Sequence, residues 1–228
     1  MSQARLAVQA APPSSWQMYR SMVGVGVVCG LLIVSVFQLT RPVIERNKAE
    51  ALQRAIFQVL PEARSSTTFR LAGEERFEIV QDEAAGGPRV YAGYDDDRQL
   101  VGLAVEAQGM GYQDVIRLLY GYSFAENAIV GIRVLESRET PGLGDKIETD
   151  PDFLANFERL DVSLTADLSA IVHPIEPVKH GKKTDPWQID GITGATISSK
   201  AIANILSRSS SYWIPRMRQN LNDFREAE

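Results

Sequence analysis

The segment from Asp190 to Ser199 combines the residue types that can hold a phosphate group. It has the sequence D-G-I-T-G-A-T-I-S-S, with two glycines and several small hydroxyl residues ahead of a helical pattern. The first backbone N–H groups of such a helix have no partner within the helix, and the positive end of its dipole faces the turn. A phosphate placed there is well stabilised. A structural alternative stays open, in which Thr193, Thr196, Ser198 or Ser199 is the N-cap of the helix.

Few other residues could carry chemistry. The 228-residue chain has one Cys and two His, too few for an internal disulfide, a structural zinc site or an iron–sulfur cluster. It has no G-x-G-x-x-G, Walker or H-E-x-x-H motif. We interpret His173 and His180 as surface or structural residues, and Lys179–Lys183 as a solvated hairpin tip. Redox chemistry would therefore need a bound organic cofactor, and we predict neither a metal site nor a catalytic residue.

Composition excludes several classes of protein. With 44% hydrophobic and 23% charged residues, the chain resembles neither a disordered nor a collagen-like nor a multi-span membrane protein. The net charge of −5 argues against nucleic-acid binding, which needs clustered basic residues. The first 40 residues contain two Lys or Arg and no acidic residue, so 22 basic and 29 acidic residues remain after them. The part beyond residue 40 thus carries −7 and is long enough to bury a core.

An apolar segment near the N-terminus predicts a membrane anchor. The 20 residues between Arg20 and Arg41 carry no charge, and as a helix they would span about 30 Å, the thickness of the hydrocarbon core. We predict an N-terminal segment at 1–20 and a transmembrane helix at 21–40; a cleaved leader is the alternative. Gly26 and Gly30 have the spacing of a helix-packing face. More Lys and Arg follow the span than precede it, which by itself favours a cytoplasmic C-terminal part.

The rest of the chain has the pattern of an α+β domain. An amphipathic linker helix is predicted at 41–62, followed by one domain at 63–228. Strands come first and a long helix begins near Thr196, with one apolar face and an interruption at Pro215. A Gly/Pro loop, E-T-P-G-L-G-D, lies at Glu139–Asp145. The predicted strands are Thr67–Leu71, Phe77–Val80, Val90–Tyr94, Leu100–Ala107, Val115–Tyr122, Ile129–Leu135 and Trp187–Ile189, with a turn at Gln108–Tyr112, a short helix at Asp152–Phe157 and a helix face of Ile197, Ala201, Ile202, Ile205 and Leu206.

The sequence D-G-I-T-G-A-T, which ends at Thr196, resembles the flavinylation motif of FMN-binding domains. In that motif the final Thr carries FMN through a phosphoester. The E-T-P-G-L-G-D segment matches a second part of these domains, at about the expected distance upstream. With its length and single N-terminal span, the chain resembles the G subunits of Rnf (Rsx) electron-transport complexes. The C subunit of the sodium-translocating NADH:quinone reductase is the close alternative.

The resemblance implies a fold and a set of site residues. It implies an FMN-binding domain with a mainly antiparallel sheet and flanking helices, and covalent FMN on Thr196. An ApbE-type flavin transferase moves FMN from FAD onto this Thr with Mg²⁺, so Thr196 is not itself catalytic. Thr140 and Leu143 are implied to line the flavin. The recognition turn is implied to consist of Asp190, Gly191, Thr193, Gly194 and Ala195.

The resemblance also implies a function. The chain would be a membrane-anchored electron carrier in an ion-translocating ferredoxin:NAD oxidoreductase of the bacterial inner membrane, with its flavin domain in the periplasm. Its partners would be the membrane, the other subunits of the complex and the flavin transferase. It would take part in the reaction of the complex without catalysing it alone. Two other hypotheses stay open: a non-redox assembly subunit, and a secreted binding protein with a cleaved leader.

Overall fold

The chain contains two compact units, Met1–Glu50 and Ala51–Glu228. Residues 1–14 of the predicted N-terminal segment lie outside the described part, whereas Ser15–Arg20 are helical. The computed structural model describes residues 15–73, 76–80 and 87–225.

The first helix, α1 (Ser15–Val59), contains the whole predicted transmembrane segment and most of the predicted linker helix. Pro42 lies inside it, so the two predicted helices are continuous. Within the described residues, α1 is the one helix long and apolar enough to cross a membrane. The large apolar side chains from Met22 to Leu39 are exposed, as expected for residues that would face lipid.

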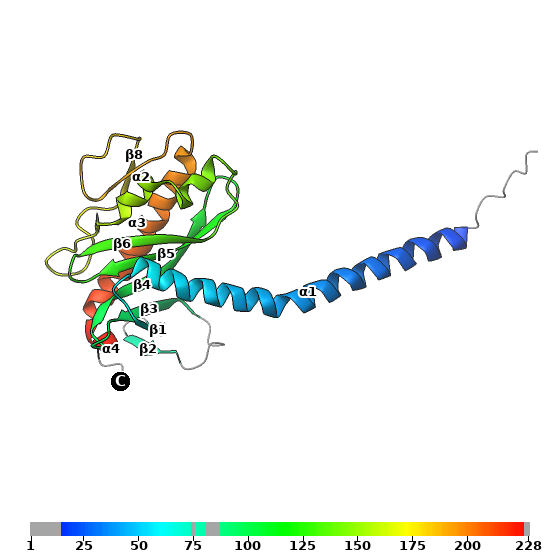
Figure 1. Ribbon diagram of the computed structural model, residues 1–228, viewed down its shortest axis with the longest axis horizontal. Coiled ribbons are helices and arrows are strands. Elements are labelled where there is room, and N and C mark those ends of the chain that lie inside the picture. Colours follow the sequence, from blue (N-terminus) through cyan, green and yellow to red (C-terminus); the bar gives the residue numbers. More distant parts are fainter. Residues whose placement is uncertain (1–14, 74–75, 81–86, 226–228) are drawn as a thin grey trace, which may run out of the picture. The chain divides into compact units, whose positions relative to one another are not determined.

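The main sheet of the second unit has seven antiparallel strands in the order β2-β1-β3-β4-β5-β6-β7 (Figure 1). This confirms the α+β class with a mainly antiparallel sheet. The strands are β1 (Ser65–Ala72), β2 (Arg76–Ile79), β3 (Arg89–Tyr94), β4 (Leu100–Met110), β5 (Val115–Ser123), β6 (Ala128–Glu136) and β7 (Leu160–Asp161).

Both faces of the sheet are covered, because side chains alternate along its central strands. In β4, Leu103 and Val105 join the core cluster that contains helix α3 (Thr196–Gln219). Ala104, which lies between them, joins a second cluster with the end of α1. The same alternation recurs in β3 and β5. The apolar run of β4 is therefore buried by one helix on each side.

Glycines allow the last turn of α1 to lie directly on the sheet. Four neighbouring strands contribute one glycine each at this contact. A Cβ added to Gly121 would overlap the carbonyl oxygen of Val59, and one added to Gly131 would lie 3.1 Å from the Cα of Val59. Backbone therefore contacts backbone where α1 ends. The four glycines are Gly93, Gly102, Gly121 and Gly131.

The remaining elements are short helices and a small second sheet. Strands β8 (Glu176–Val178) and β9 (Gln188–Asp190) pair in parallel, so the prediction of a hairpin tip at Lys179–Lys183 is wrong. A tight hairpin turn joins only antiparallel strands, and here the segment belongs to a longer connection. The other elements are η1 (Gly144–Glu148), α2 (Pro151–Leu154), η2 (Ala155–Phe157) and α4 (Leu221–Arg225).

Two predicted interruptions are also wrong. Strand β4 continues to Met110, because Gly109 lets α3 approach closely: a Cβ there would lie 2.6 Å from Cγ1 of Ile205. Helix α3 continues through Pro215, which is itself buried beside Ile214. Burial of this helix overrides the low helix propensity of proline.

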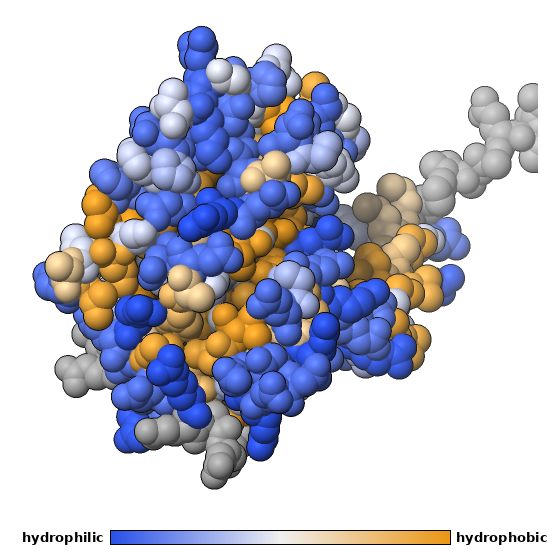
Figure 2. All heavy atoms as spheres, turned by 60° about the vertical axis from the view of Figure 1, so that its left-hand side comes forward, coloured by the Kyte–Doolittle hydropathy of each residue, from blue (hydrophilic) through white to orange (hydrophobic). Residues whose placement is uncertain are grey.

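The domain buries large apolar side chains, and one face of its surface is mainly hydrophilic (Figure 2). On the face shown in Figure 2, hydrophilic residues dominate, and apolar residues gather in limited patches between them. The large aromatic side chains Phe69, Phe153 and Phe157 are almost fully buried. The free energy of burying such side chains, at about 25 cal/mol per Å² of apolar surface, dominates the stability of the fold.

Two buried tyrosines lie two positions apart on β5, and loss of the hydroxyl should change the free energy of unfolding differently at each. Within the described part of the chain, the Tyr122 hydroxyl has no hydrogen-bond partner, whereas the Tyr120 hydroxyl lies 3.1 Å from Oγ of Ser209. We expect Tyr122→Phe to leave the free energy of unfolding unchanged or raise it by up to about 1 kcal/mol. Tyr120→Phe should lower it by about 1 kcal/mol. Urea unfolding of the full chain in detergent measures both values.

The same tyrosine predicts a loss of stability at alkaline pH. Burial raises the pKa of Tyr122 to about 12 from its ordinary value of 10.0, with Arg218 opposing the shift. The folded state therefore keeps the proton that the unfolded state loses, so stability is complete below pH 10 and falls between pH 10 and 12. The Tyr122→Phe variant should lose less unfolding free energy than the parent between pH 10 and 12. Equal losses of unfolding free energy in the variant and the parent would contradict the role of Tyr122.

Candidate cofactor site

The predicted phosphate-binding segment is a tight turn between β9 and α3. Gly194 has φ +86°, a left-handed conformation that a side chain would strain, although a Cβ there would meet no atom within 4 Å. The hydroxyl of Ser199 accepts a hydrogen bond from the N–H of Ile192 (3.1 Å) and donates one to the carbonyl of Ala195 (2.8 Å). Ser199 thus ties both arms of the turn to the first turn of α3.

Thr196 is the first residue of α3 and is exposed. The N-cap is Ala195, whose side chain makes no capping hydrogen bond. The alternative that Thr193, Thr196, Ser198 or Ser199 is the N-cap is therefore wrong. The first N–H groups of α3 have no partner within the helix and no hydroxyl cap, so they can stabilise an anion beside Thr196.

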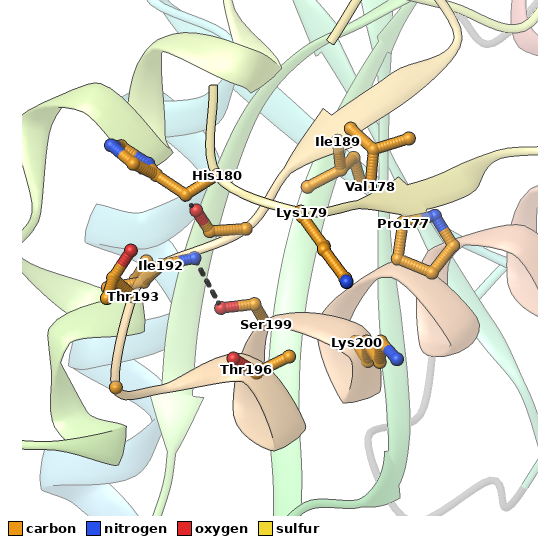
Figure 3. A pocket seen from close by; sticks show the side chains of 12 residues that line it. Pro177, Val178, Lys179, His180, Ile189, Ile192, Thr193, Thr196, Ser199 and Lys200 are labelled. Atoms are coloured by element: carbon orange, nitrogen blue, oxygen red, sulfur yellow. Dashed lines mark hydrogen bonds between the residues drawn. The ribbon is translucent and has the colours of Figure 1, made fainter. Parts of the chain in front are cut away.

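Two cavities meet at Thr196 and Gly194. One, of about 260 Å³, lies between this turn and β8 (Figure 3). The other, of about 390 Å³, opens on the opposite side and falls within the range of about 300–1,000 Å³ typical of small-molecule sites. The second cavity is lined by Tyr112, Glu139, Thr140, Leu143, Gly144, Gly194, Ala195, Thr196, Ile197 and Ser198.

The smaller cavity has basic side chains on its wall. Lys179, His180 and Lys200 line it together with Thr196, and Figure 3 shows Lys179 and Lys200 on the same side of the turn. Lys200 follows Thr196 by four residues, so the two share one face of α3. The imidazole Nδ1 of His180 lies 3.1 Å from the carbonyl oxygen of Gly191. This side of Thr196 is therefore suited to negative charge.

Asp190 holds the basic segment in place. Its carboxylate accepts hydrogen bonds from the backbone N–H of Gly181 (2.8 Å) and of Lys182 (3.4 Å). The buried side-chain amide of Asn156 forms two hydrogen bonds with the backbone of Asp190. Oδ1 of Asn156 accepts from the N–H of Asp190 (3.0 Å), and Nδ2 donates to the carbonyl of Asp190 (3.1 Å). Lys183 donates to the same Asn156 oxygen at 3.1 Å. Burial lowers the pKa of Lys183, and nearby Asp190 opposes this shift.

The E-T-P-G-L-G-D loop forms the far wall of the larger cavity. The carbonyl of Thr140 accepts the N–H of Leu143 at 3.1 Å, and Gly142 has φ +76°, which closes the turn. Leu143 is 51% exposed, so an apolar side chain faces the open side of the cavity. Next to it, Glu139 is 5% exposed and hydrogen-bonds to Ser198 of α3. The two sequence motifs are thus in direct contact.

The structure brings most of the predicted site residues to one place. Thr140, Leu143, Gly194, Ala195 and Thr196 line the larger cavity. Gly191 and Thr193 line the smaller one, while Asp190 lines a third, adjacent cavity of about 260 Å³ and acts through the turn that it holds.

Several residues of the site are not evident from the sequence. Ile197 was expected on the buried face of α3 but is 56% exposed, because the first turn of the helix faces the cavity rather than the sheet. Glu139 lies in the E-T-P-G-L-G-D segment, but the sequence indicates no role for it. Tyr112 and Asn156 lie in no motif, so no sequence signal pointed to them. Lys179 was assigned to a solvated tip.

Known proteins have sequences similar to this chain. Residues 111–210 match the family described as FMN-binding domain, and this range contains both motifs. The G subunit of an ion-translocating oxidoreductase complex from Methanosarcina acetivorans is 34% identical over 84% of this chain and 90% of its own length. The corresponding G subunit from Escherichia coli K12 is 32% identical over 79% of this chain and 82% of its own.

Solved structures share the fold. The crystal structure of Shewanella oneidensis NqrC superposes with a TM-score of 0.58, covering 79% of this chain and 97% of NqrC at 19% identity. The C subunit of the Na⁺-translocating NADH-quinone reductase from Parabacteroides distasonis gives a TM-score of 0.51 at 21% identity, covering 73% of this chain and 79% of its own. The resemblance seen in the motifs is confirmed: this chain belongs to the family of G subunits of ion-translocating oxidoreductase complexes, and it contains an FMN-binding domain.

Proposed function

We propose that this chain is a membrane-anchored flavoprotein subunit that carries electrons within an Rnf-type ion-translocating ferredoxin:NAD oxidoreductase, using FMN bound covalently to Thr196. The observation that carries this proposal is the position of Thr196. Its side chain is exposed at the start of α3, and both cavities open beside it. Thr140 and Leu143, from the second motif, line the larger of them.

The residues present fit FMN. A phosphoester on Thr196 would lie at the N-terminus of a 24-residue helix, with Lys179 and Lys200 on the same side. The larger cavity offers Leu143, Ile197 and Tyr112, which suit the planar, largely apolar ring system. The hydroxyl and the basic groups thus suit the phosphate of the cofactor, and the apolar wall suits its ring system.

The protein would supply position and electrostatics, while FMN supplies the redox chemistry. Thr196 would keep the cofactor attached through repeated turnovers. The turn closed by Ser199 would fix the attachment point, and the lysines would neutralise the phosphate. The chain has neither a nucleotide-binding motif nor enough Cys for an iron–sulfur cluster, so other subunits must supply and accept the electrons.

Maturation would require a flavin transferase of the ApbE type. In the proposed step, Oγ1 of Thr196 attacks the phosphorus of the FMN half of FAD with Mg²⁺ on the transferase. The new bond is Oγ1–P, the pyrophosphate bond breaks, AMP leaves, and a base on the transferase takes the hydroxyl proton. Exposure of Thr196 at the molecular surface gives a second protein access to it.

The apolar part of α1 would anchor the subunit in the bacterial inner membrane, with the flavin domain in the periplasm. The charge distribution around the span opposes this orientation only weakly, since long domains can translocate regardless of flanking charge. Protease added to spheroplasts should digest the flavin domain in the parent strain. Protection of the domain until the membrane is lysed would contradict the orientation.

The attachment step has a direct test. In a host without an ApbE-type transferase, the full-length protein should show no flavin fluorescence after denaturing electrophoresis. Supplying the transferase with FAD and Mg²⁺ should restore the fluorescent band. Ser211→Ala, which removes an exposed hydroxyl of α3 that lines neither cavity, should remain fluorescent in the normal host. A fluorescent band in the transferase-free host would contradict the proposed maturation.

A further inference from the structure

A buried carboxylate joins three segments around the larger cavity. Glu139 is 5% exposed. One oxygen accepts hydrogen bonds from the backbone N–H of Tyr112 (2.8 Å) and of Gln113 (3.1 Å). The other accepts from the hydroxyl of Ser198. Because Ser198 follows Thr196 by two residues on α3, the carboxylate links the attachment point to the wall that contains Tyr112.

Backbone packs closely against this carboxylate. A Cβ at Gly144 would lie 2.7 Å from Oε2 of Glu139, and one at Gly111 would overlap Oε1. Two glycines thus let backbone pack against the carboxylate from both sides. The hydrogen bonds and the close packing together fix Glu139 in one conformation.

Glu139 brings a negative charge to the cavity wall. Within residues 15–73, 76–80 and 87–225, no Lys, Arg or His forms an ion pair with it. Its charge is offset instead by the three hydrogen-bond donors and by the positive end of the α3 dipole. A fixed negative charge beside a ring that gains electrons opposes its reduction.

We propose that Glu139 is the positioning residue of the flavin site, holding the start of α3 against the Tyr112 wall, and that its charge lowers the reduction potential of the bound cofactor. This inference rests on the proposed function. Glu139 itself forms no bond to the cofactor; it acts through Ser198, through the backbone of Tyr112 and through its charge.

Two substitutions separate the positional role from the charge. Glu139→Gln keeps the size of the side chain and an oxygen that can accept from the N–H groups of Tyr112 and Gln113. Its amide nitrogen would donate to Ser198 instead of accepting from it, and the charge is removed. We expect full-length Glu139→Gln holoprotein to be flavinylated like the parent, with a reduction potential shifted to a more positive value in spectroelectrochemical titration.

Glu139→Ala removes both the hydrogen bonds and the charge. Its rate of flavinylation should therefore fall by about tenfold, a factor typical for loss of a hydrogen bond to a charged group. Glu158→Gln is the matched control, since Glu158 is exposed, and it should change neither quantity.

The outcomes discriminate between the inference and the function on which it rests. A potential of Glu139→Gln equal to that of the parent would overturn the role of the charge. An unchanged flavinylation rate and an unchanged visible circular dichroism spectrum in Glu139→Ala would overturn the positional role. If the parent protein carries no flavin on Thr196, the proposed function fails, and this inference fails with it. Flavinylation of the parent with unchanged variants would refute the inference alone.

Discussion

Thr196→Ala is expected to give a complex that assembles normally but no longer transfers electrons from ferredoxin to NAD. Thr196 is exposed at the start of α3, and in the part of the chain described by the structure its side chain makes no hydrogen bond. The substitution should therefore change the free energy of unfolding by less than about 0.5 kcal/mol. It removes the only proposed attachment for the redox cofactor. Ferredoxin-dependent NAD reduction in isolated membranes measures the loss, and native electrophoresis measures assembly.

Two matched variants sharpen this result. Thr196→Ser keeps a hydroxyl at the same position and should retain measurable electron transfer. Ser211→Ala removes an exposed hydroxyl of α3 that lines neither cavity and should transfer electrons like the parent. If Thr196→Ala transfers electrons at the parental rate, the subunit acts as a non-redox scaffold instead. The Gly26 and Gly30 face of α1 would then be the next part of the chain to test.

Gly121→Ala is expected to lower the free energy of unfolding by about 3 kcal/mol, near the upper end of the usual cost of overpacking. The added Cβ would overlap the carbonyl oxygen of Val59 and lie 3.0 Å from its carbonyl carbon. Backbone atoms cannot rotate away as a side chain does, so the end of α1 would have to move off β5. Urea unfolding of the full chain in detergent gives the difference from the parent.

Gly131→Ala is the control for this contact. Its Cβ would lie 3.1 Å from Cα of Val59, a tighter contact than usual but one that a small shift relieves. We expect a loss of about 1 kcal/mol, at the lower end of the cost of overpacking. Equal stability of Gly121→Ala and the parent would mean that the last turn of α1 does not pack on these strands.

Local patterns in the sequence were sufficient to predict most of the sheet. The runs Val115–Tyr122 and Ile129–Leu135 correspond to β5 and β6, because β-branched and aromatic residues favour extended structure wherever both faces are covered. Two of the errors came from glycine and proline. Gly109 and Pro215 act as breakers in isolation, but the close approach of α3 to β4 and the burial of its C-terminal half decide the local structure.

The site was predictable where its residues form a continuous motif. Asp190–Thr196 and Thr140–Leu143 are short segments whose sequences resemble known FMN-binding domains, and the structure places both beside one cavity. Glu139 contacts Ser198, which is 59 positions away, and Asn156 contacts Asp190, which is 34 positions away. No local pattern in the sequence encodes such contacts. Lys179 could not be predicted because only the parallel pairing of β8 and β9 brings it to the cavity beside Thr196. This pairing is not visible in the local sequence.

The intact mass of the full-length protein purified from its native host shows whether FMN is bound covalently to Thr196. We expect a mass above that of the unmodified chain by one FMN less one water. Peptide mapping should place the whole increment on the fragment that contains Thr196. An unmodified mass in protein taken from an active complex, or an increment on another residue, would contradict it.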